Sequence, residues 1–362
     1  MLPTTLTDTF LQLVRLGVGA ETDGQLGDCT HIDWIALEAL AARQGLSAIV
    51  LDGLDKVPPS SFDMPRMMKR QWIGRVVQGY EYRFDLYCRA IAEMAAFYRD
   101  HGFKMMVLKG YACALNWPKP EHRPSGDIDI WQFGQYREAD AALASEKGIS
   151  VDSSHHHHTV FYWGDFMVEN HYDFINVHHH KSNAEYEKIL KKLGEDDSFS
   201  VGLYGEKVYL PSPNLHVLFL LKHSVSHFAS GTISLRQLLD WGFFVKVHST
   251  EINWQMVQEV VAQFGMEHML EIFNRICVED LGFAKDLFPE FGCNPLLKNK
   301  VLNEILSPEF TGKTPASVIP RIIFRYRRWR SNEWKHQICY KESMWSAFWS
   351  GVWNHLLKPS SI

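Results

Sequence analysis

Features typical of membrane, secreted and polyanion-binding proteins are missing from this 362-residue chain. It has no run of about 18 apolar residues, so we predict no membrane-spanning helix. Its N-terminus lacks a basic leading segment and carries Asp8 in the first apolar stretch, unlike a secretion signal. The formal net charge is -5, which argues against general polyanion binding. We therefore expect a cytoplasmic protein without a stable nucleic-acid partner.

Paired cysteines are also missing. The six cysteines are scattered and none forms a Cys-x-x-Cys pair: Cys29, Cys88, Cys113, Cys277, Cys293 and Cys339. This arrangement fits a reduced protein better than a disulfide framework. Any one of them can be interpreted as a catalytic nucleophile, but a buried, inert thiol is the interpretation we favour.

The pattern of apolar residues divides the chain into three parts. Residues 1–100 have helical spacing, and the segment from about Met64 to His101 predicts one long helix. Residues 101–210 contain short strand patterns, and residues 211–362 return to helical spacing. The hydrophobic fraction of 46% argues against long disordered segments. We predict an α+β fold, with a small mixed β-sheet core, N-terminal helices and a C-terminal helical region.

Within the predicted core, short apolar or alternating runs bounded by turn residues indicate strands. They lie at residues 104–109, 127–131, 157–162, 166–172 and in a hairpin over 201–210. Helices are predicted over 135–147, 183–193, 213–227 and 234–241, and Ser212 is in place to cap the third of these.

Asp127 and Asp129 lie two residues apart on a predicted strand, so both carboxylates point to the same face. Ile128 and Ile130 then point to the opposite face, into a core. Two neighbouring carboxylates repel unless a cation lies between them, and Mg²⁺ prefers such oxygen ligands. The alternative is a pair of solvated acids on an edge strand.

The residues before these acids suit phosphate binding. Lys109 and Gly110 end a predicted strand, and free N–H groups of a helix starting there could hold a phosphate that the glycine lets approach closely. Arg123 could bind a phosphate in bidentate fashion. Ser125 lies in the turn that leads to Asp127. These four are the candidate phosphate-binding residues.

A third carboxylate comes from the alternating segment of residues 167–173. Glu169, His171 and Asp173 would share one face of this strand. We favour Glu169 as the third acid because apolar residues flank it, and Asp173 and Asp165 are the alternatives.

The order Leu-Lys-Gly, then RPSGDIDIW, then VENH resembles the uncharacterised nucleotidyltransferase family of the polymerase-β-like superfamily, over about residues 90–250. The resemblance implies that Asp127, Asp129 and Glu169 bind two Mg²⁺ or Mn²⁺ ions, and that Gly110 contacts nucleotide phosphates. Many superfamily members have Gly-Ser or Gly-Gly where this chain has Lys-Gly-Tyr, so Lys109 would replace a serine contact.

The activity implied by the resemblance is nucleotidyl transfer from an NTP to an unknown hydroxyl acceptor. One metal ion would activate the acceptor hydroxyl, and the other would bind the triphosphate. Glu169 would hold the acceptor-side ion, while Lys109 and Arg123 neutralise developing charge. Two alternatives are a non-catalytic nucleotide or polyanion binder of the same fold and a histidine-rich metalloenzyme.

Histidines are concentrated in two tracts, His155–His158 and His178–His180. With His171 and Asp173 nearby, they could form a transition-metal site, or they could be polar loop residues near a polyanionic ligand. On a regular strand, His155 and His157 would face away from the other two, so the four would not share one ion.

Two later helices carry paired polar residues four positions apart. His223 and His227 share one helical face, and Arg236 and Asp240 share another. The resemblance implies that these residues line the nucleotide or acceptor pocket. The alternative is a helix–helix hydrogen-bond network with one ion pair within the second helix. No glutamate completes an His-Glu-x-x-His motif here, which excludes that class of zinc protease.

Near the C-terminus, Arg321, Arg325 and Arg328 fall on one helical face, followed by an apolar stripe from Trp345 to Leu356. We favour a terminal helix pair docked on the core. A surface for a polyanion, a nucleic acid or a membrane interface is the alternative.

Overall fold

The computed structural model describes residues 4–20, 32–178, 180–290, 292, 294–310 and 314–345. Cys29, Cys293 and His179 lie outside the described residues, as does the C-terminal apolar stripe beyond Trp345. None of the described helices combines the length and apolarity that crossing a lipid bilayer requires.

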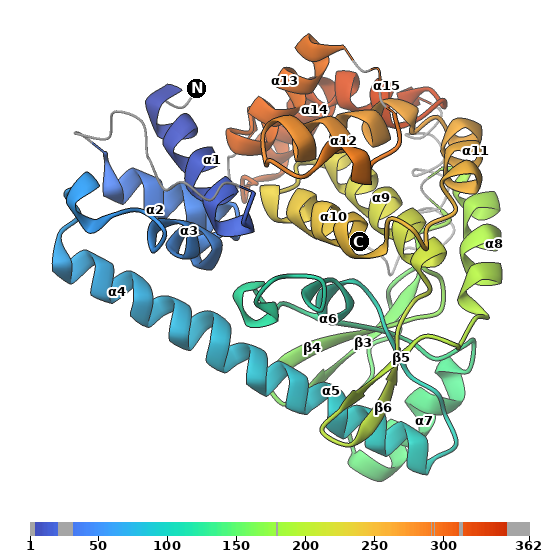
Figure 1. The fold of residues 1–362 in the computed structure, drawn as a ribbon. Coiled ribbons are helices and arrows are strands. Elements are labelled where there is room, and N and C mark those ends of the chain that lie inside the picture. Colours follow the sequence, from blue (N-terminus) through green and yellow to red (C-terminus); the bar gives the residue numbers. More distant parts are fainter. Residues whose placement is uncertain are drawn as a thin grey trace.

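Helices form the first part of the chain, as predicted. They are α1 (Thr4–Val18), α2 (Trp34–Arg43), α3 (Ser47–Leu54), α4 (Arg66–Val76) and α5 (Arg83–Asp100). A π-helical turn over Val77–Tyr82 joins α4 to α5, so helical backbone continues from Arg66 to Asp100. This element is the long diagonal helix of Figure 1. The predicted long helix is therefore confirmed, with a local change of hydrogen-bond pattern inside it.

In the described part of the chain, six short strands form one mixed sheet, which confirms the α+β fold class (Figure 1). They are β1 (Met106–Val107), β2 (Ile128–Trp131), β3 (His158–Trp163), β4 (Phe166–His171), β5 (Ser200–Leu203) and β6 (Glu206–Tyr209). Their order is β3-β4-β2-β1-β6-β5. The β2–β4 and β1–β6 pairs are parallel, and the remaining neighbours are antiparallel. Among the described residues, three α-helices and a short 3-10 turn (Pro120–His122) connect the strands. The α-helices are α6 (Lys109–Ala114), α7 (Tyr136–Lys147) and α8 (Asn183–Gly194).

The two faces of β2 belong to different environments, which confirms the predicted alternation. Ile128 and Ile130 are fully buried in a core that includes Ile91 of α5 and Leu143 of α7. Trp131, on the other face, belongs to a second core shared with the C-terminal helices. Asp129 faces the same side as Trp131 because strand residues two apart point the same way. The sheet thus has one closed apolar face and one face that carries the acids.

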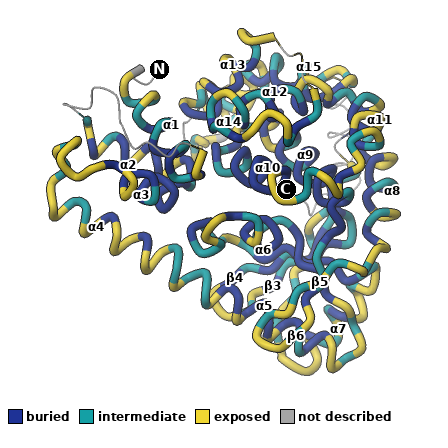
Figure 2. The backbone as a smooth tube through the Cα atoms, in the orientation of Figure 1, coloured by how far each residue is buried: buried dark blue, intermediate teal, exposed yellow. Residues whose placement is uncertain are grey.

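The C-terminal helices cover the acid-bearing side of the sheet. They are α9 (Pro213–Ser230), α10 (Leu235–His248), α11 (Trp254–Phe264), α12 (Glu267–Glu279), α13 (Pro295–Leu306), α14 (Val318–Ser331) and α15 (Glu333–Cys339). The expected cap at Ser212 is present, since its hydroxyl accepts a hydrogen bond from the Leu215 N–H at 3.4 Å. Figure 2 shows buried backbone concentrated in α9 and α10, whereas α4 is largely exposed.

The helices from both ends of the chain share one hydrophobic core. Gln44, after α2, donates to the Ile305 carbonyl at 2.9 Å and accepts from the Leu235 N–H at 2.7 Å. Of the predicted terminal pair, only the basic helix, α14, lies among the described residues, and α15, which follows it, is docked with Cys339 fully buried. Arg328 of α14 donates to the Ser230 carbonyl at 3.2 Å. These contacts place the chain's last described helices beside α9.

Candidate active site

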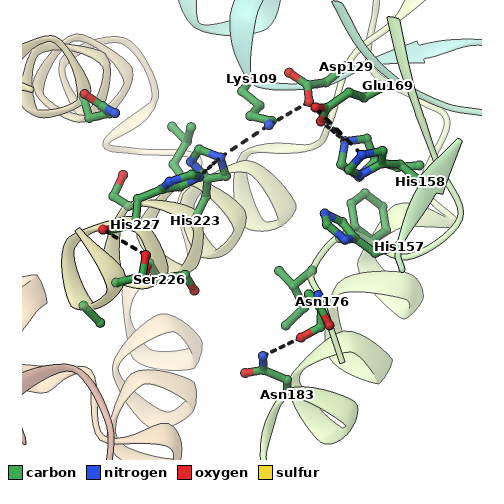
Figure 3. A pocket seen from close by; sticks show the side chains of 18 of the residues that line it. Lys109, Asp129, His157, His158, Glu169, Asn176, Asn183, His223, Ser226 and His227 are labelled. Atoms are coloured by element: carbon green, nitrogen blue, oxygen red, sulfur yellow. Dashed lines mark hydrogen bonds and ion pairs between the residues drawn. The ribbon is translucent and has the colours of Figure 1, made fainter. Parts of the chain in front are cut away.

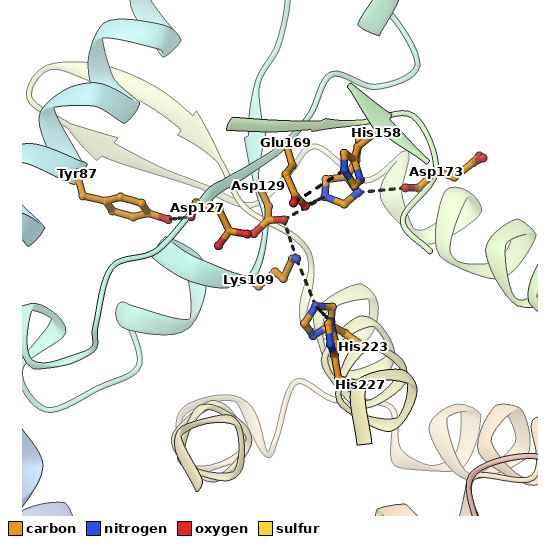
Figure 4. Close-up of polar contacts among 10 residues, drawn as sticks. Tyr87, Lys109, Asp127, Asp129, His158, Glu169, Asp173, His223 and His227 are labelled. Carbon is orange, nitrogen blue, oxygen red and sulfur yellow. Dashed lines mark hydrogen bonds and ion pairs between the residues drawn. The ribbon is translucent and has the colours of Figure 1, made fainter. Parts of the chain in front are cut away.

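The acids are brought together by the pairing of β2 with β4. In this parallel ladder Asp129 lies opposite Glu169, and both side chains point away from the Ile128 core (Figure 4). Asp127 immediately precedes β2, and its carbonyl accepts a hydrogen bond from the Tyr87 hydroxyl at 2.9 Å. Asp127, Asp129 and Glu169 therefore lie close together on the cavity side of the sheet.

These acids line a cavity of about 690 Å³ between the sheet, α9 and α10 (Figure 3). Most of the residues singled out in the sequence line it too: Lys109, Gly110, Arg123, Asp127, Asp129, Glu169, His171, His223, His227, Arg236 and Asp240. Ser125 and Asp173 are not among the lining residues. The Ser125 carbonyl instead accepts a hydrogen bond from Arg83 at 3.1 Å.

Lys109 joins the acids to the histidines of α9. Its ammonium nitrogen lies 2.6 Å from Oδ1 of Asp129 and 3.3 Å from Nε2 of His223. His227, one helical turn further on, lies 3.1 Å from the same His223 nitrogen. Burial lowers the pKa of both histidines and the charge of Lys109 lowers it further. Both imidazoles are therefore neutral hydrogen-bonding groups at neutral pH.

Gly110 is required by a close approach between α6 and α5. A Cβ atom at this position would lie 2.4 Å from the Tyr87 hydroxyl oxygen. The same hydroxyl holds the Asp127 carbonyl. Gly110 thus lets the start of α6 lie against the turn that carries the first acid.

The three carboxylates affect one another's ionisation. Burial raises the pKa of Asp127, and the negative charges of Asp129 and Glu169 raise it further. Burial also disfavours ionised Asp129 and Glu169, but Lys109 and His171 lower the pKa of Asp129, and His171 lowers that of Glu169. Oxygens of Asp129 and Glu169 and a nitrogen of His171 lie within 4.8 Å of one another. This crowded set of hard oxygen donors fits a divalent cation, whose charge would relieve the repulsion felt by Asp127.

His171 is the hydrogen-bonding neighbour of two of the acids. Its Nε2 lies 3.0 Å from Oδ1 of Asp129 and 3.5 Å from Oε2 of Glu169. Burial opposes its protonation, but these two carboxylates raise its pKa to about 9. The predicted common face does not extend to Asp173. Because β4 ends at His171, the Asp173 carboxylate turns away and pairs with Lys191, leaving its carbonyl 3.1 Å from Nδ1 of His171.

Arg123 and Asp240 form a buried bidentate ion pair, with nitrogen–oxygen distances of 2.8 and 3.0 Å. Trp117 donates to the same carboxylate at 2.9 Å. The alternative of an ion pair between Arg236 and Asp240 within α10 is therefore wrong, because Arg123 takes the carboxylate. Arg236 lines the cavity and forms no ion pair with any residue that the structure describes.

Some residues in or behind the cavity wall gave no signal in the sequence. Tyr87 positions Asp127 from the middle of α5, and Trp117 positions Asp240. His336 and Tyr340 of the C-terminal region form part of the cavity wall. Each of these residues looks like an ordinary core position in its own helix or turn, and only the folded arrangement relates it to the acids.

The mixed sheet with helices before and after it is consistent with a nucleotidyltransferase-like α+β fold. Over residues 30–282 the chain matches the model of the uncharacterised nucleotidyltransferase family, and it belongs to this family. The match extends further in both directions than the residues 90–250 indicated by the sequence motifs. It therefore includes α2 to α5 and two of the helices that line the cavity, α9 and α10.

Similarity to other proteins is weak. None of the curated proteins compared with this chain matches it. The crystal structure of an antigenic nucleotidyltransferase-like protein from Paracoccidioides brasiliensis is similar at 14% sequence identity with a TM-score of 0.33. The similarity covers 44% of this chain and 75% of that one.

Proposed function

We propose that this protein transfers a nucleoside monophosphate group from an NTP to a hydroxyl acceptor. The observation that carries the proposal is the pairing of Asp129 with Glu169 across β2 and β4, beside Asp127. These acids line a cavity of about 690 Å³. That volume lies within the range of about 300–1,000 Å³ typical of small-molecule sites. Membership of the nucleotidyltransferase family supports an NTP as the substrate.

Asp127, Asp129 and Glu169 would hold the divalent cations, and we expect two ions. Mg²⁺ or Mn²⁺ fits because both favour carboxylate oxygens. When bound, such cations supply neutralisation of the triphosphate charge and activation of the acceptor hydroxyl. We assign Glu169 to the ion on the acceptor side, as the resemblance to the family implies.

Two basic side chains are positioned to bind phosphate. Lys109 is held by Asp129, and it becomes available to a phosphate oxygen when a cation takes over that carboxylate. Arg236 lines the cavity without an ion-pair partner among the described residues, so its guanidinium can bind an anion. Arg123 contributes positive charge but its bidentate edge is taken by Asp240. We therefore assign Arg123 to positioning Asp240 and give phosphate contacts to Lys109 and Arg236.

The remaining polar groups suit orientation of the acceptor. His223 and His227 are neutral at neutral pH and can accept or donate hydrogen bonds to a hydroxyl compound. Ser125 and Asp173 do not line the cavity, and we assign them no contact with substrate.

The test is incubation of the full chain with each α-labelled NTP in the presence of Mg²⁺ or Mn²⁺. We expect cation-dependent pyrophosphate release and transfer of label to the protein or an added hydroxyl compound. Asp127→Asn and Glu169→Gln should abolish both. Asp165→Asn is the matched control, because Asp165 is an exposed acid in the β3–β4 turn.

Binding measurements separate catalysis from simple recognition. If the protein binds NTP with Mg²⁺ but releases no pyrophosphate with any acceptor, the non-catalytic binder of the same fold is the better description. If it binds no NTP in the presence of either cation, the proposed function is wrong.

A further inference from the structure

Three imidazoles gather at the end of the β3–β4 hairpin that faces the cavity. They belong to His157, His158 and His171, and one ring nitrogen of each lies within 4.8 Å of the other two. Their ring centroids are 4.3 to 5.6 Å apart. His158 and His171 are buried and His157 is half-buried, and all three line the cavity. Figure 3 shows His157 and His158 on its wall.

The backbone fixes this convergence. His158 and His171 are direct partners in the antiparallel ladder, so their side chains lie on one face of the sheet. His157 precedes the strand, and its carbonyl accepts hydrogen bonds from the N–H groups of Tyr172 and Asp173 at 3.0 and 3.1 Å. The side chain of His157 therefore does not follow the strand alternation that would place it on the opposite face of the sheet. The expectation for a regular strand does not hold here, and two consecutive histidines approach the same partner.

The orientation of His171 suits a metal ligand. Its Nδ1 lies 3.1 Å from the carbonyl oxygen of Asp173, to which it donates, and its Nε2 points at the carboxylates of Asp129 and Glu169. Histidines that bind metals commonly donate their second ring nitrogen to a backbone carbonyl in this way, which fixes the ring. The lone pair of Nε2 is then directed into the cavity once its proton is displaced.

His158 supplies a second observation. Its Nδ1 is buried and has no hydrogen-bond partner among the described residues. Its Nε2 lies 3.9 Å from Oε1 of Glu169, whose other oxygen lies 3.5 Å from Nε2 of His171. Two imidazoles thus flank one carboxylate. Buried polar atoms without partners are rare in proteins, and a metal ligand is one reason for their presence.

We propose that His157, His158 and His171 bind one divalent transition-metal ion of the Zn²⁺ class, with Glu169 as the nearest carboxylate. Ligand nitrogens about 2.1 Å from such an ion lie about 3.4 Å from one another, so small side-chain rotations would close the present cluster. Imidazole favours zinc and its first-row neighbours, whereas Mg²⁺ favours oxygen ligands. The histidine site therefore prefers different metal ions from the carboxylate site. This proposal does not rest on nucleotidyl transfer.

The test is Co²⁺ binding to the tag-free, metal-stripped full chain, because Co²⁺ replaces Zn²⁺ and gives a visible absorption spectrum. We expect one bound equivalent, displaced by Zn²⁺ and not by excess Mg²⁺. His158→Asn should weaken Co²⁺ binding at least tenfold. His157→Ala should do the same, and because this side chain precedes the strand it serves if the first variant fails to fold.

Matched controls exclude chelation by other histidines. His155→Ala and His178→Ala change exposed members of the two tracts and should leave Co²⁺ affinity unchanged. Asp127→Asn should also retain the Co²⁺ spectrum although it abolishes turnover, so the two proposals can fail separately. The inference is overturned if the His157 and His158 variants bind Co²⁺ normally, if binding is lost with His155 or His178, or if Mg²⁺ competes as well as Zn²⁺.

Discussion

The ammonium nitrogen of Lys109 lies 2.6 Å from Oδ1 of Asp129, a carboxylate that is only 1% exposed. Both charges are largely withdrawn from water, so each depends on the other for compensation. His171 contacts the same carboxylate oxygen at 3.0 Å. The ion pair therefore keeps two buried charges compensated and at the same time occupies an oxygen that a divalent cation would use.

Replacing Lys109 with an uncharged residue should make the stability of the folded protein depend on added metal ions. In Lys109→Met, Asp129 loses its main counter-charge, so we expect the free energy of unfolding in chelator to fall by about 3–5 kcal/mol. Added Mg²⁺ should then stabilise the variant more than the wild type, because it no longer competes with the ammonium group. Urea unfolding with and without Mg²⁺ measures both effects.

Lys104→Met provides the control for this substitution. Lys104 is a half-exposed lysine whose ion pair with Asp197 is at the surface, so its loss should change stability by less than about 1 kcal/mol. It should not alter the response to Mg²⁺. Equal stabilisation of wild type and Lys109→Met by Mg²⁺ would show that Lys109 and the cation do not share Asp129.

The contact between Gly110 and Tyr87 predicts a compensating pair of substitutions. Gly110→Ala places a methyl group 2.4 Å from the Tyr87 hydroxyl oxygen and should destabilise the protein by about 1–3 kcal/mol. Tyr87→Phe removes the donor to the Asp127 carbonyl and should cost about 0.5–1.5 kcal/mol. The double variant should lose less stability than the sum, because the colliding oxygen is gone.

Chemical unfolding of the four proteins in this cycle gives the coupling directly. Gly126→Ala is the control, since a Cβ there meets no atom within 4 Å. Strict additivity of Gly110→Ala and Tyr87→Phe would contradict the argument that the hydroxyl enforces the glycine.

Local patterns predicted the parts of the site that lie on one element. The alternation of Asp127, Ile128 and Asp129 indicated which side of β2 carries acid, and Ile128 is buried in the opposite core as expected. The hairpin around Gly205 was likewise predictable, because tight hairpin turns favour glycine at positions with positive φ. Gly205 joins β5 to β6 with a φ of 86°. Short-range periodicity and turn chemistry were sufficient for both.

Contacts between side chains on different elements could not be predicted from the sequence in this way. The choice of Arg123 as the partner of Asp240 depends on how α10 packs against the segment before β2, and spacing within α10 alone suggested Arg236. The direction of Asp173 depended on the residue at which β4 ends, which no local signal marks. The approach of His157 and His158 to His171 required the register of β3 with β4.

The two arginines beside the cavity should separate structural from ligand-binding roles. Arg123→Lys keeps the charge but loses the bidentate fork to Asp240, so we expect a loss of about 2–3 kcal/mol in unfolding free energy. Arg236→Lys should leave stability nearly unchanged and weaken triphosphate affinity, because no described residue is its ion-pair partner. Urea unfolding and calorimetric titration with NTP and Mg²⁺ distinguish them. A large stability loss confined to Arg236→Lys would reverse the assignment.

Glu187 should give the protein a pH-dependent stability near neutrality. Its buried carboxylate accepts the N–H groups of Phe174 and Ile175 at 2.9 and 3.1 Å, and burial raises its pKa to about 7. A raised carboxyl pKa means that the folded state binds the proton more tightly than the unfolded chain, whose value is near 4.5. The associated stability is fully present below pH 4.5 and is lost as the pH rises through about 7.

The neutral substitution Glu187→Gln isolates this contribution. From pH 4.5 to 8 the unfolding free energy of the wild type should fall relative to the variant by up to about 3 kcal/mol. A constant offset between the two proteins reflects the altered hydrogen bond and does not affect the slope. Glu185→Gln, at an exposed position of the same helix, should keep the wild-type slope. Parallel pH profiles of the wild type and Glu187→Gln would mean that Glu187 keeps its ordinary pKa in the fold.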